Sequence, residues 1–187
     1  MRKVTREVAF DGQWTRERAT KVSELFNSMA EEWAARHSDG ARISPVADAL
    51  ERGGVDNLPR WLELGSGTGA GTSVIAHRVD SLVCCDLARE MLLNAPADLA
   101  PQVQADASRL PFAADTFAAV LMVNMILFPG EVDRVLAPGG KIVWVNTMGD
   151  QTPIHLPPDD VAAALPGEWR GVTARAGSGF WAALERM

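Results

Sequence analysis

The stretch Leu62-Glu63-Leu64-Gly65-Ser66-Gly67-Thr68-Gly69 decides the fold. It leaves an apolar segment at residues 60–64, which is typical of a buried strand, and enters a turn with glycine at every second position. Glycine adopts positive φ and lets a ligand approach the backbone where a Cβ would block it. The helical pattern that follows would present unpaired N–H groups and a positive dipole end. The stretch therefore predicts a strand, turn and helix that bind a dinucleotide, a phosphate or a methionine-type carboxylate.

The chain beyond this stretch alternates apolar segments with helical patterns. We expect strands at residues 60–64, 81–85, 103–105, 117–123 and 141–146, and helices around Val74, Ile75 and Val79, around Leu87, Met91 and Leu92, at 132–136 and at 159–164. Two further strands, near 172–176 and 180–184, indicate a C-terminal hairpin. Strand–helix alternation favours an α/β fold with a mainly parallel seven-stranded sheet, which binds ligands beyond the carboxyl ends of its strands.

Residues 1–56 precede this core. Residues 1–14 show no clear period and are expected to form a loose arm. From Thr15 a helix is predicted by one apolar stripe that ends near His37: Val22, Leu25, Phe26, Met29 and Trp33. Ser44-Pro45 is typical of a helix start, and Gly53-Gly54 of its end. At 187 residues the chain fits a single domain, residues 1–187, with an N-terminal part at 1–56 and a core at 57–187.

Composition and charge exclude several classes of protein. The chain is 47% hydrophobic and 22% charged, which is ordinary for a globular domain. Its net charge is −6 and no dense run of Lys or Arg occurs, so nucleic acid is not expected as a partner. No segment approaches the ~20 apolar residues of a membrane span. The basic start lacks an apolar run behind it, so we expect no secretory signal and a cytoplasmic location.

The two cysteines, Cys84 and Cys85, are neighbours within a predicted strand. Their side chains should point to opposite faces, where a bridge between them would be strained. We expect both to be reduced and to pack as small hydrophobes, with a redox or nucleophilic thiol as the alternative. Histidines and carboxylates also lack ligand spacing, so no metal site is expected.

The residues around the glycines narrow the choice of ligand. The dinucleotide pattern G-x-G-x-x-G meets Ala70 at its third glycine, which that pattern tolerates. Glu63 would repel a pyrophosphate but would attract an ammonium group. The phosphate-binding P-loop is excluded because no Gly-Lys-Ser/Thr follows. Asp86 ends the next strand, where a carboxylate accepts hydrogen bonds from ribose hydroxyls; a cap on the next helix is the alternative.

With these motifs the chain resembles the class I S-adenosylmethionine-dependent methyltransferases, especially the group that includes the ubiquinone/menaquinone-type enzymes. Five blocks carry the resemblance in order over residues 57–147: Glu63-Leu-Gly-Ser-Gly-Thr-Gly69, Asp86-Leu-Ala-Arg-Glu-Met-Leu92, Gln104-Ala-Asp-Ala-Ser-Arg-Leu-Pro-Phe112, Asp115-Thr-Phe117 and Arg134-Val-Leu-Ala-Pro-Gly-Gly-Lys-Ile142. The resemblance implies a Rossmann-like class I methyltransferase fold, S-adenosylmethionine as methyl donor, and residues 1–56 as an N-terminal arm and helical lid.

The resemblance also implies which residues bind the donor. Gly65, Ser66, Gly67 and Gly69 would surround its methionine part, with Glu63 at the amino group. Asp86 would hold the ribose and Leu87 would lie against the adenine. Asp106, beside Ala107, would accept from the adenine amino group, although a local turn is its alternative role. Val123 and Asn124 would border the sulfonium, although Asn124 is also typical of a strand cap.

The acceptor side departs from the family pattern. The segment between Asn124 and Lys141 is short, and its start, residues 125–129, is apolar where many relatives carry histidine or acidic residues. The acceptor specificity of the family therefore cannot be carried over to this chain. His155 and Asp150 are the candidate general bases, and a solvated or structural role is the alternative for each. Trp33 would close the lid or simply pack. Met122, Met125 and Phe128 would form core or pocket wall.

Three functions remain in view. The first is methyl transfer to a small-molecule acceptor by in-line displacement, which would make the chain an enzyme. The second is a protein that binds S-adenosylmethionine or S-adenosylhomocysteine without catalysis and acts as a regulatory or assembly partner. The third, a nicotinamide oxidoreductase, is disfavoured by Glu63 and by the lack of a recognisable substrate domain.

Overall fold

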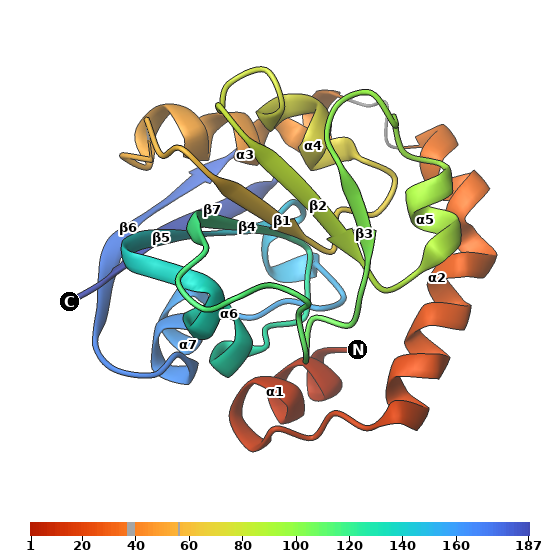
Figure 1. Ribbon diagram of the computed structural model, residues 1–187, viewed down its shortest axis with the longest axis horizontal. Coiled ribbons are helices and arrows are strands. Elements are labelled where there is room, and N and C mark those ends of the chain that lie inside the picture. Colours follow the sequence, from red (N-terminus) through yellow and green to blue (C-terminus); the bar gives the residue numbers. More distant parts are fainter. Residues whose placement is uncertain (37–39, 56) are drawn as a thin grey trace.

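A computed structural model describes residues 1–36, 40–55 and 57–187 (Figure 1). Within this part, seven strands form one sheet in the order β3-β2-β1-β4-β5-β7-β6. The strands β1 to β5 run parallel, whereas β7 is antiparallel to both β5 and β6. The mainly parallel sheet and the C-terminal hairpin are therefore confirmed. The strand bounds are Trp61–Leu64, Leu82–Asp86, Gln102–Gln104, Phe117–Val123, Leu136–Asn146, Trp169–Ala176 and Gly179–Arg186 for β1 to β7.

Helices cover both faces of the sheet. On one face α1, α6 and α7 enclose a core with the side chains of Leu62, Val120 and Trp144. On the other face α3 and α4 pack over Trp61, Leu121 and Val143. The helix α2 lies along α5 at the β3 edge, as Figure 1 shows. The helix bounds are Arg2–Asp11, Arg16–Arg36, Gly40–Arg52, Ala70–Ile75, Arg89–Leu93, Pro129–Val135 and Pro158–Ala164 for α1 to α7, with a 3₁₀ turn, η1, at Gly149–Gln151.

The alternation of side chains along each strand produces these two cores. Cys84 belongs to the layer under α3 and α4, and Cys85 to the layer under α1, α6 and α7. Both are buried free thiols, as the sequence predicts. Burial raises the pKa of each thiol to about 12, so both stay protonated. No helix in the described ranges is long and apolar enough to cross a bilayer.

The expectation of a loose arm at residues 1–14 is wrong, because Arg2–Asp11 form the helix α1. Gly12 ends it with a left-handed φ of 63°. The helix buries Thr5, Val8 and Ala9, and an ion pair between Arg6 and Asp160 attaches it to α7. Few of its residues are apolar, so packing on the core stabilises it more than any pattern that the local sequence shows.

Two further helix bounds differ from expectation. The helix α3 begins at Gly40 rather than at Ser44, and Pro45 lies inside it. Pro45 packs against the β6–β7 hairpin, where a Cβ at Gly179 would come within 2.6 Å of its Cγ, so tertiary contact outweighs the local start signal. The helix α4 ends at Ile75, which leaves His77 in the following turn instead of inside a helix. The predicted helix end at His37 lies outside the described residues.

Candidate functional site

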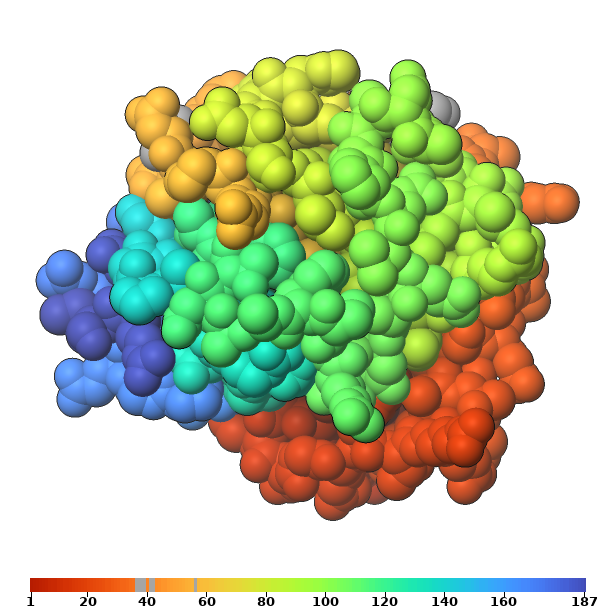
Figure 2. All heavy atoms as spheres, in the orientation of Figure 1, coloured from red at the N-terminus to blue at the C-terminus, as the bar shows by residue number. Residues whose placement is uncertain are grey.

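A cavity opens at the carboxyl ends of β1, β2 and β4, beside β3, where the glycine turn was expected to bind a ligand. Its walls also come from the N-terminal segment, which Figure 2 shows in red against the green segment that follows β3. Its lining includes Trp33 and ten of the eleven predicted donor-binding residues: Glu63, Gly65, Ser66, Gly67, Asp86, Leu87, Asp106, Ala107, Val123 and Asn124. The exception is Gly69, which caps the start of α4 and packs on Pro96.

The turn after β1 brings its backbone to the cavity because two glycines adopt a left-handed conformation. Gly65 has φ 68° and Gly67 has φ 55°. A Cβ on Gly65 would collide with Met125 Sδ, whereas a Cβ on Gly67 would meet nothing within 4 Å. The main chain at Gly67 is therefore open to a ligand, and the turn at Gly65 closes against the segment that follows β4.

Ser66, between these glycines, carries an unsatisfied hydroxyl. The residue is 7% exposed, and its Oγ is the one buried side-chain oxygen or nitrogen without a hydrogen-bond partner among the residues the structure describes. Buried polar atoms are nearly always paired, since an unpaired one costs about 1–3 kcal/mol. Because Ser66 lines the cavity, its hydroxyl is available to a polar group of a bound ligand.

Glu63 lies at the base of the cavity and is 1% exposed. Its carboxyl accepts hydrogen bonds from Thr72 Oγ1 at 2.6 Å and from Cys84 Sγ at 3.7 Å. Burial raises its pKa to about 7, and the nearby charge of Asp86 acts in the same direction. A ligand cation in the cavity would stabilise the ionised form, so Glu63 suits an ammonium group.

Asp86, at the end of β2, is held by main-chain groups on both oxygens. Its Oδ2 accepts from Gly67 N and its Oδ1 from Ala88 N, each at 2.8 Å. Burial raises the pKa of this carboxyl, and the N–H groups oppose that rise. Asp86 therefore does contact the start of the next helix, the alternative role considered in the sequence, since Ala88 is the N-cap residue of α5. The same carboxyl lines the cavity, so the ribose role stays a prediction that is compatible with it.

Asp106 follows β3 and also combines two contacts. Its Oδ1 accepts from Ser108 N at 2.8 Å, which is the local turn considered as its alternative role. Its two oxygens also lie 3.1 and 3.0 Å from Trp14 Nε1. Sequence reasoning missed Trp14, because residues 1–14 showed no period. The available signal was an aromatic residue in a polar link directly before a helix start.

Asn124 closes the end of β4. Its amide donates to Thr147 Oγ1 at 2.8 Å and accepts from Thr147 N at 2.9 Å. These bonds fix Asn124 at a φ of 50° and link the ends of β4 and β5. The side chain thus serves as the strand cap considered in the sequence, while the residue also borders the cavity. Its role at a sulfonium stays a prediction.

The two candidate bases lie outside the lining of the cavity. His155 Nδ1 is 3.1 Å from Asn146 Oδ1, and its ring meets the ring of Phe180 edge-on at 5.3 Å. Burial lowers the pKa of His155. Asp150 is exposed, 3.7 Å from Arg175. Their catalytic roles stay predictions. Three methionine and aromatic positions are now placed: Met125 and Phe128 line the cavity, and Met122 is fully buried core.

Metal ligands do not gather anywhere in the described ranges, where no three His, Cys, Asp or Glu side chains come together in a group that could hold an ion. The polar groups at the cavity are instead main-chain N–H groups, the hydroxyls of Ser23, Ser66 and Thr68, the amide of Asn124, and the carboxyls of Glu63, Asp86 and Asp106. Such a set fits an organic ligand that carries a cation and hydroxyl or amino groups.

Comparison with known proteins agrees with this geometry. Residues 62–144 match the family model described as "Methyltransferase domain". Solved structures share the fold, among them the DhpI-SAH complex, with a TM-score of 0.69 and 20% identity over 87% of this chain and 93% of that one. Residues 62–144 are thus similar to a methyltransferase domain, and the fold around them is one that S-adenosylmethionine-dependent methyltransferases share.

The curated relatives match about half of the chain. A demethylmenaquinone methyltransferase of Mycobacterium sp. (strain KMS) is 33% identical over 97 residues, 48% of this chain and 42% of the relative. The biotin biosynthesis bifunctional protein BioHC of Cellvibrio japonicus (strain Ueda107) is 34% identical over 107 residues, 52% of this chain and 21% of the relative. The chain therefore spans less than half the length of either relative.

A second solved structure extends the match in fold. A SAM dependent methyltransferase from Aquifex aeolicus aligns with a TM-score of 0.67 and 14% identity, over 83% of this chain and 98% of that one. The alignment covers more of the class I fold than the sequence matches do, since the family model stops at residue 144. The two structures thus share more of the fold than the edge of the sheet that carries the glycine turn.

Proposed function

We propose that this protein is an enzyme that binds S-adenosylmethionine and transfers its methyl group to a small-molecule acceptor. The observation that carries the proposal is the cavity, which joins the glycine turn to the carboxyls that end or follow β2 and β3. Residues 57–187 would form the core of a single domain, and residues 1–56 an arm and lid over the site.

The residues present fit the donor. Ser66 Oγ has no partner of its own and would take a polar group of the methionine part, beside the open main chain at Gly67. Glu63 would hold the ammonium group, whose charge would stabilise the ionised carboxylate against the burial that raises its pKa. Asp86 keeps lone pairs for the ribose hydroxyls, because a carboxylate accepts at about four sites. Asp106 would accept from the adenine amino group.

The reaction demands little covalent chemistry from the chain, because the bound donor supplies an activated methyl group on a sulfonium. The cavity walls would align the acceptor with the methyl carbon and sulfur and would exclude water. Positioning of this kind is worth ~7–11 kcal/mol of the barrier. Val123 and Asn124, at the end of β4, border the cavity where the resemblance puts the sulfonium.

The acceptor side of the cavity favours an apolar acceptor. The segments that follow β4 and β5 contribute the apolar side chains of Met125, Ile126, Phe128 and Ile154 to its wall. None of these side chains takes up a proton or carries charge. We therefore infer that the acceptor is uncharged where it meets this wall, and that it brings a nucleophile that needs no general base from the wall.

The same apolar wall also supports a second function, which is donor binding without catalysis. A protein that binds S-adenosylmethionine or S-adenosylhomocysteine without catalysis needs no base and no acceptor pocket. His155 and Asp150 lie outside the lining of the cavity, and the wall itself offers no base. This alternative predicts normal donor binding with no turnover on any acceptor.

Titration calorimetry with S-adenosylmethionine, S-adenosylhomocysteine and NAD tests the proposal. We expect micromolar binding of the first two and none of NAD; the reverse pattern would refute the donor assignment. Release of S-adenosylhomocysteine is then measured with a panel of apolar phenols, thiols and amines. Turnover identifies an enzyme, and binding without turnover identifies the second function.

A further inference from the structure

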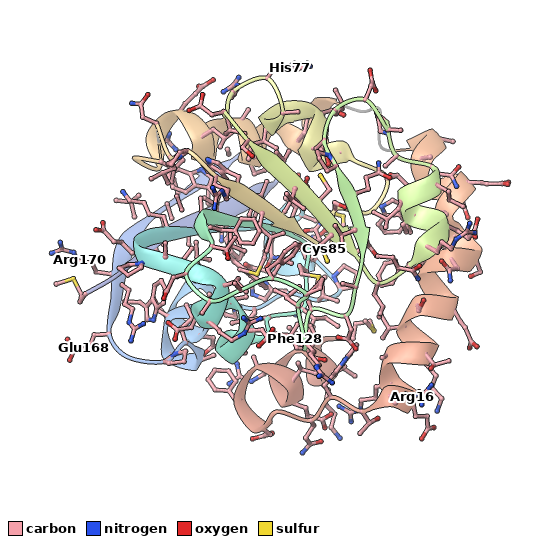
Figure 3. The ribbon with its side chains drawn as sticks, in the orientation of Figure 1. Arg16, His77, Cys85, Phe128, Glu168 and Arg170 are labelled. Atoms are coloured by element: carbon pink, nitrogen blue, oxygen red, sulfur yellow. The ribbon has the colours of Figure 1, made fainter. Side chains whose placement is uncertain are left out.

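Trp14 covers the part of the cavity that the resemblance gives to adenine. It lies in the link between α1 and α2, is half-buried, and lines the cavity. Its ring meets the ring of Phe128 edge-on, with centroids 5.1 Å apart. Figure 3 labels Phe128, between the sheet and α1, and Arg16, where α2 begins. Trp14 therefore joins the N-terminal segment to the segment after β4.

The hydrogen bond of Trp14 occupies the front of the Asp106 carboxylate. The indole Nε1 lies 3.1 Å from Oδ1 and 3.0 Å from Oδ2, so a single N–H faces both oxygens at once. Ser108 N takes a further position on Oδ1. An amino group that approached Asp106 from the cavity would have to enter the position that the indole N–H holds.

The free space leads to the same conclusion. The cavity has a volume of about 130 Å³, whereas a cavity of about 150 Å³ holds a molecule the size of benzene. Pockets for larger ligands measure about 300–1,000 Å³. A nucleoside therefore enters this site only if part of the wall moves. Trp14 is a wall residue with a polar bond that an adenine amino group would replace.

The bond of the indole to Asp106 can break while the link stays in place. Arg18 donates to Gln13 O at 2.7 Å and to Glu7 Oε2 at 2.8 Å, so the backbone of the link is fastened to both helices. The indole is held only by its ring contact with Phe128, its bond to Asp106 and the surrounding wall. A change of rotamer breaks this bond without unfolding α1 or α2.

We propose that Trp14 is a donor-site residue that competes with the adenine of the donor for the Asp106 carboxylate. The inference rests on the proposed function. The bond of the indole N–H to Asp106 holds this part of the site closed, and donor binding breaks it. Part of the binding energy of the donor is spent on this exchange, so the apparent affinity is lower than the intrinsic affinity by the fraction of open molecules.

Trp14→Phe tests the competition, because phenylalanine keeps an apolar ring beside Phe128 and lacks the N–H. We expect S-adenosylhomocysteine to bind about tenfold more tightly to Trp14→Phe than to the unmodified protein, the size of one charge-assisted hydrogen bond. Trp169→Phe is the matched control: its indole donates to Pro166 O at 2.8 Å and does not line the cavity. Affinity should not change in the control.

Asp106→Ala separates competition from simple enlargement of the pocket. In that background the N–H has no carboxylate to hold, so adding Trp14→Phe should leave the affinity unchanged. A gain of about tenfold in both backgrounds would mean that the smaller ring merely makes room, and would overturn the proposal. Equal or weaker binding by the single variant Trp14→Phe would overturn it as well.

A measurement that keeps Trp14 applies even if Trp14→Phe does not fold. In Trp33→Phe, which removes the other indole that lines the cavity, acrylamide quenching of tryptophan fluorescence should increase when S-adenosylhomocysteine is added, because the indole of Trp14 becomes accessible. Unchanged or reduced quenching contradicts the proposal. If well-folded unmodified protein and Trp14→Phe both fail to bind the nucleoside, the proposed function itself falls. If the unmodified protein binds it normally, only the role of Trp14 is at issue.

Discussion

The raised pKa of Glu63 should make the folded protein less stable as pH rises, and the substitution Glu63→Gln should abolish this pH dependence. Burial raises this pKa from 4.5 to about 7 in the folded protein. Between those pH values the folded state keeps a proton that the unfolded chain has lost, so the free energy of unfolding falls as pH rises. The full effect, at about 1.4 kcal/mol per pKa unit, is about 3 kcal/mol. It is absent below pH 4.5 and complete above pH 7.

Urea unfolding at pH 5 and pH 8 measures this effect. We expect the unmodified protein to lose about 2–3 kcal/mol more than Glu63→Gln between the two values. Glu168→Gln removes the same charge from the exposed surface, where Figure 3 labels it at the rim of the molecule, and should follow the unmodified protein. If the free energy of unfolding of Glu63→Gln falls with pH as much as that of the unmodified protein, Glu63 is not the buried acid that causes the pH dependence.

Donor binding should lower the raised pKa of Glu63 again. An ammonium group beside Glu63 favours the ionised carboxylate, so binding of S-adenosylhomocysteine at pH 6 should release close to one proton and at pH 8 almost none. Calorimetry in buffers of different ionisation enthalpy counts this proton. Glu63→Gln should release none. Equal proton release by both proteins would place the ammonium group away from Glu63.

Three further variants probe the site. In Asp86→Ala the carboxyl that accepts from Gly67 N is lost, and calorimetry should show donor affinity weaker by about 1–3 kcal/mol; unchanged affinity would remove Asp86 from the site. Ser66→Ala deletes a hydroxyl without a partner, so its Tm should not fall while donor affinity drops by about 1 kcal/mol. His155→Ala should lower the Tm through the lost contact with Asn146 and leave donor affinity unchanged, because His155 does not line the cavity; weaker donor binding would contradict this placement.

The sheet and its ligand-binding edge were predictable because their signals are local. The strand β4 has the predicted bounds, Phe117–Val123, since a segment buried on both faces is apolar throughout. Gly65 and Gly67 mark a turn that only positive φ allows. Asp86 and Asp106 follow from topology, because parallel strands deliver their carboxyl ends to one edge.

The N-terminal part was less predictable because its structure depends on distant contacts. The helix α1 is stabilised where Val8 and Ala9 meet a core built from residues after 60. The bond from Trp14 to Asp106 joins positions 92 apart in the sequence. No local period reports such a contact. The cavity is thus predicted on its sheet side and at Trp33, whereas the contribution of Trp14 was not predicted.

The two neighbouring thiols on β2 lie under different helix layers, so the chemical reactivity of each thiol reports when its own layer opens. Since Cys84 and Cys85 are protonated and buried on opposite faces, a reagent such as an aromatic disulfide modifies Cys84 only after the layer above it has opened. It modifies Cys85 only after the opposite layer, or the wall of the cavity that Cys85 lines, has opened. Cys84→Ala and Cys85→Ala each leave a single sulfur. Modification rates of these two variants tell whether the layers detach together or one before the other, at positions one residue apart in the chain.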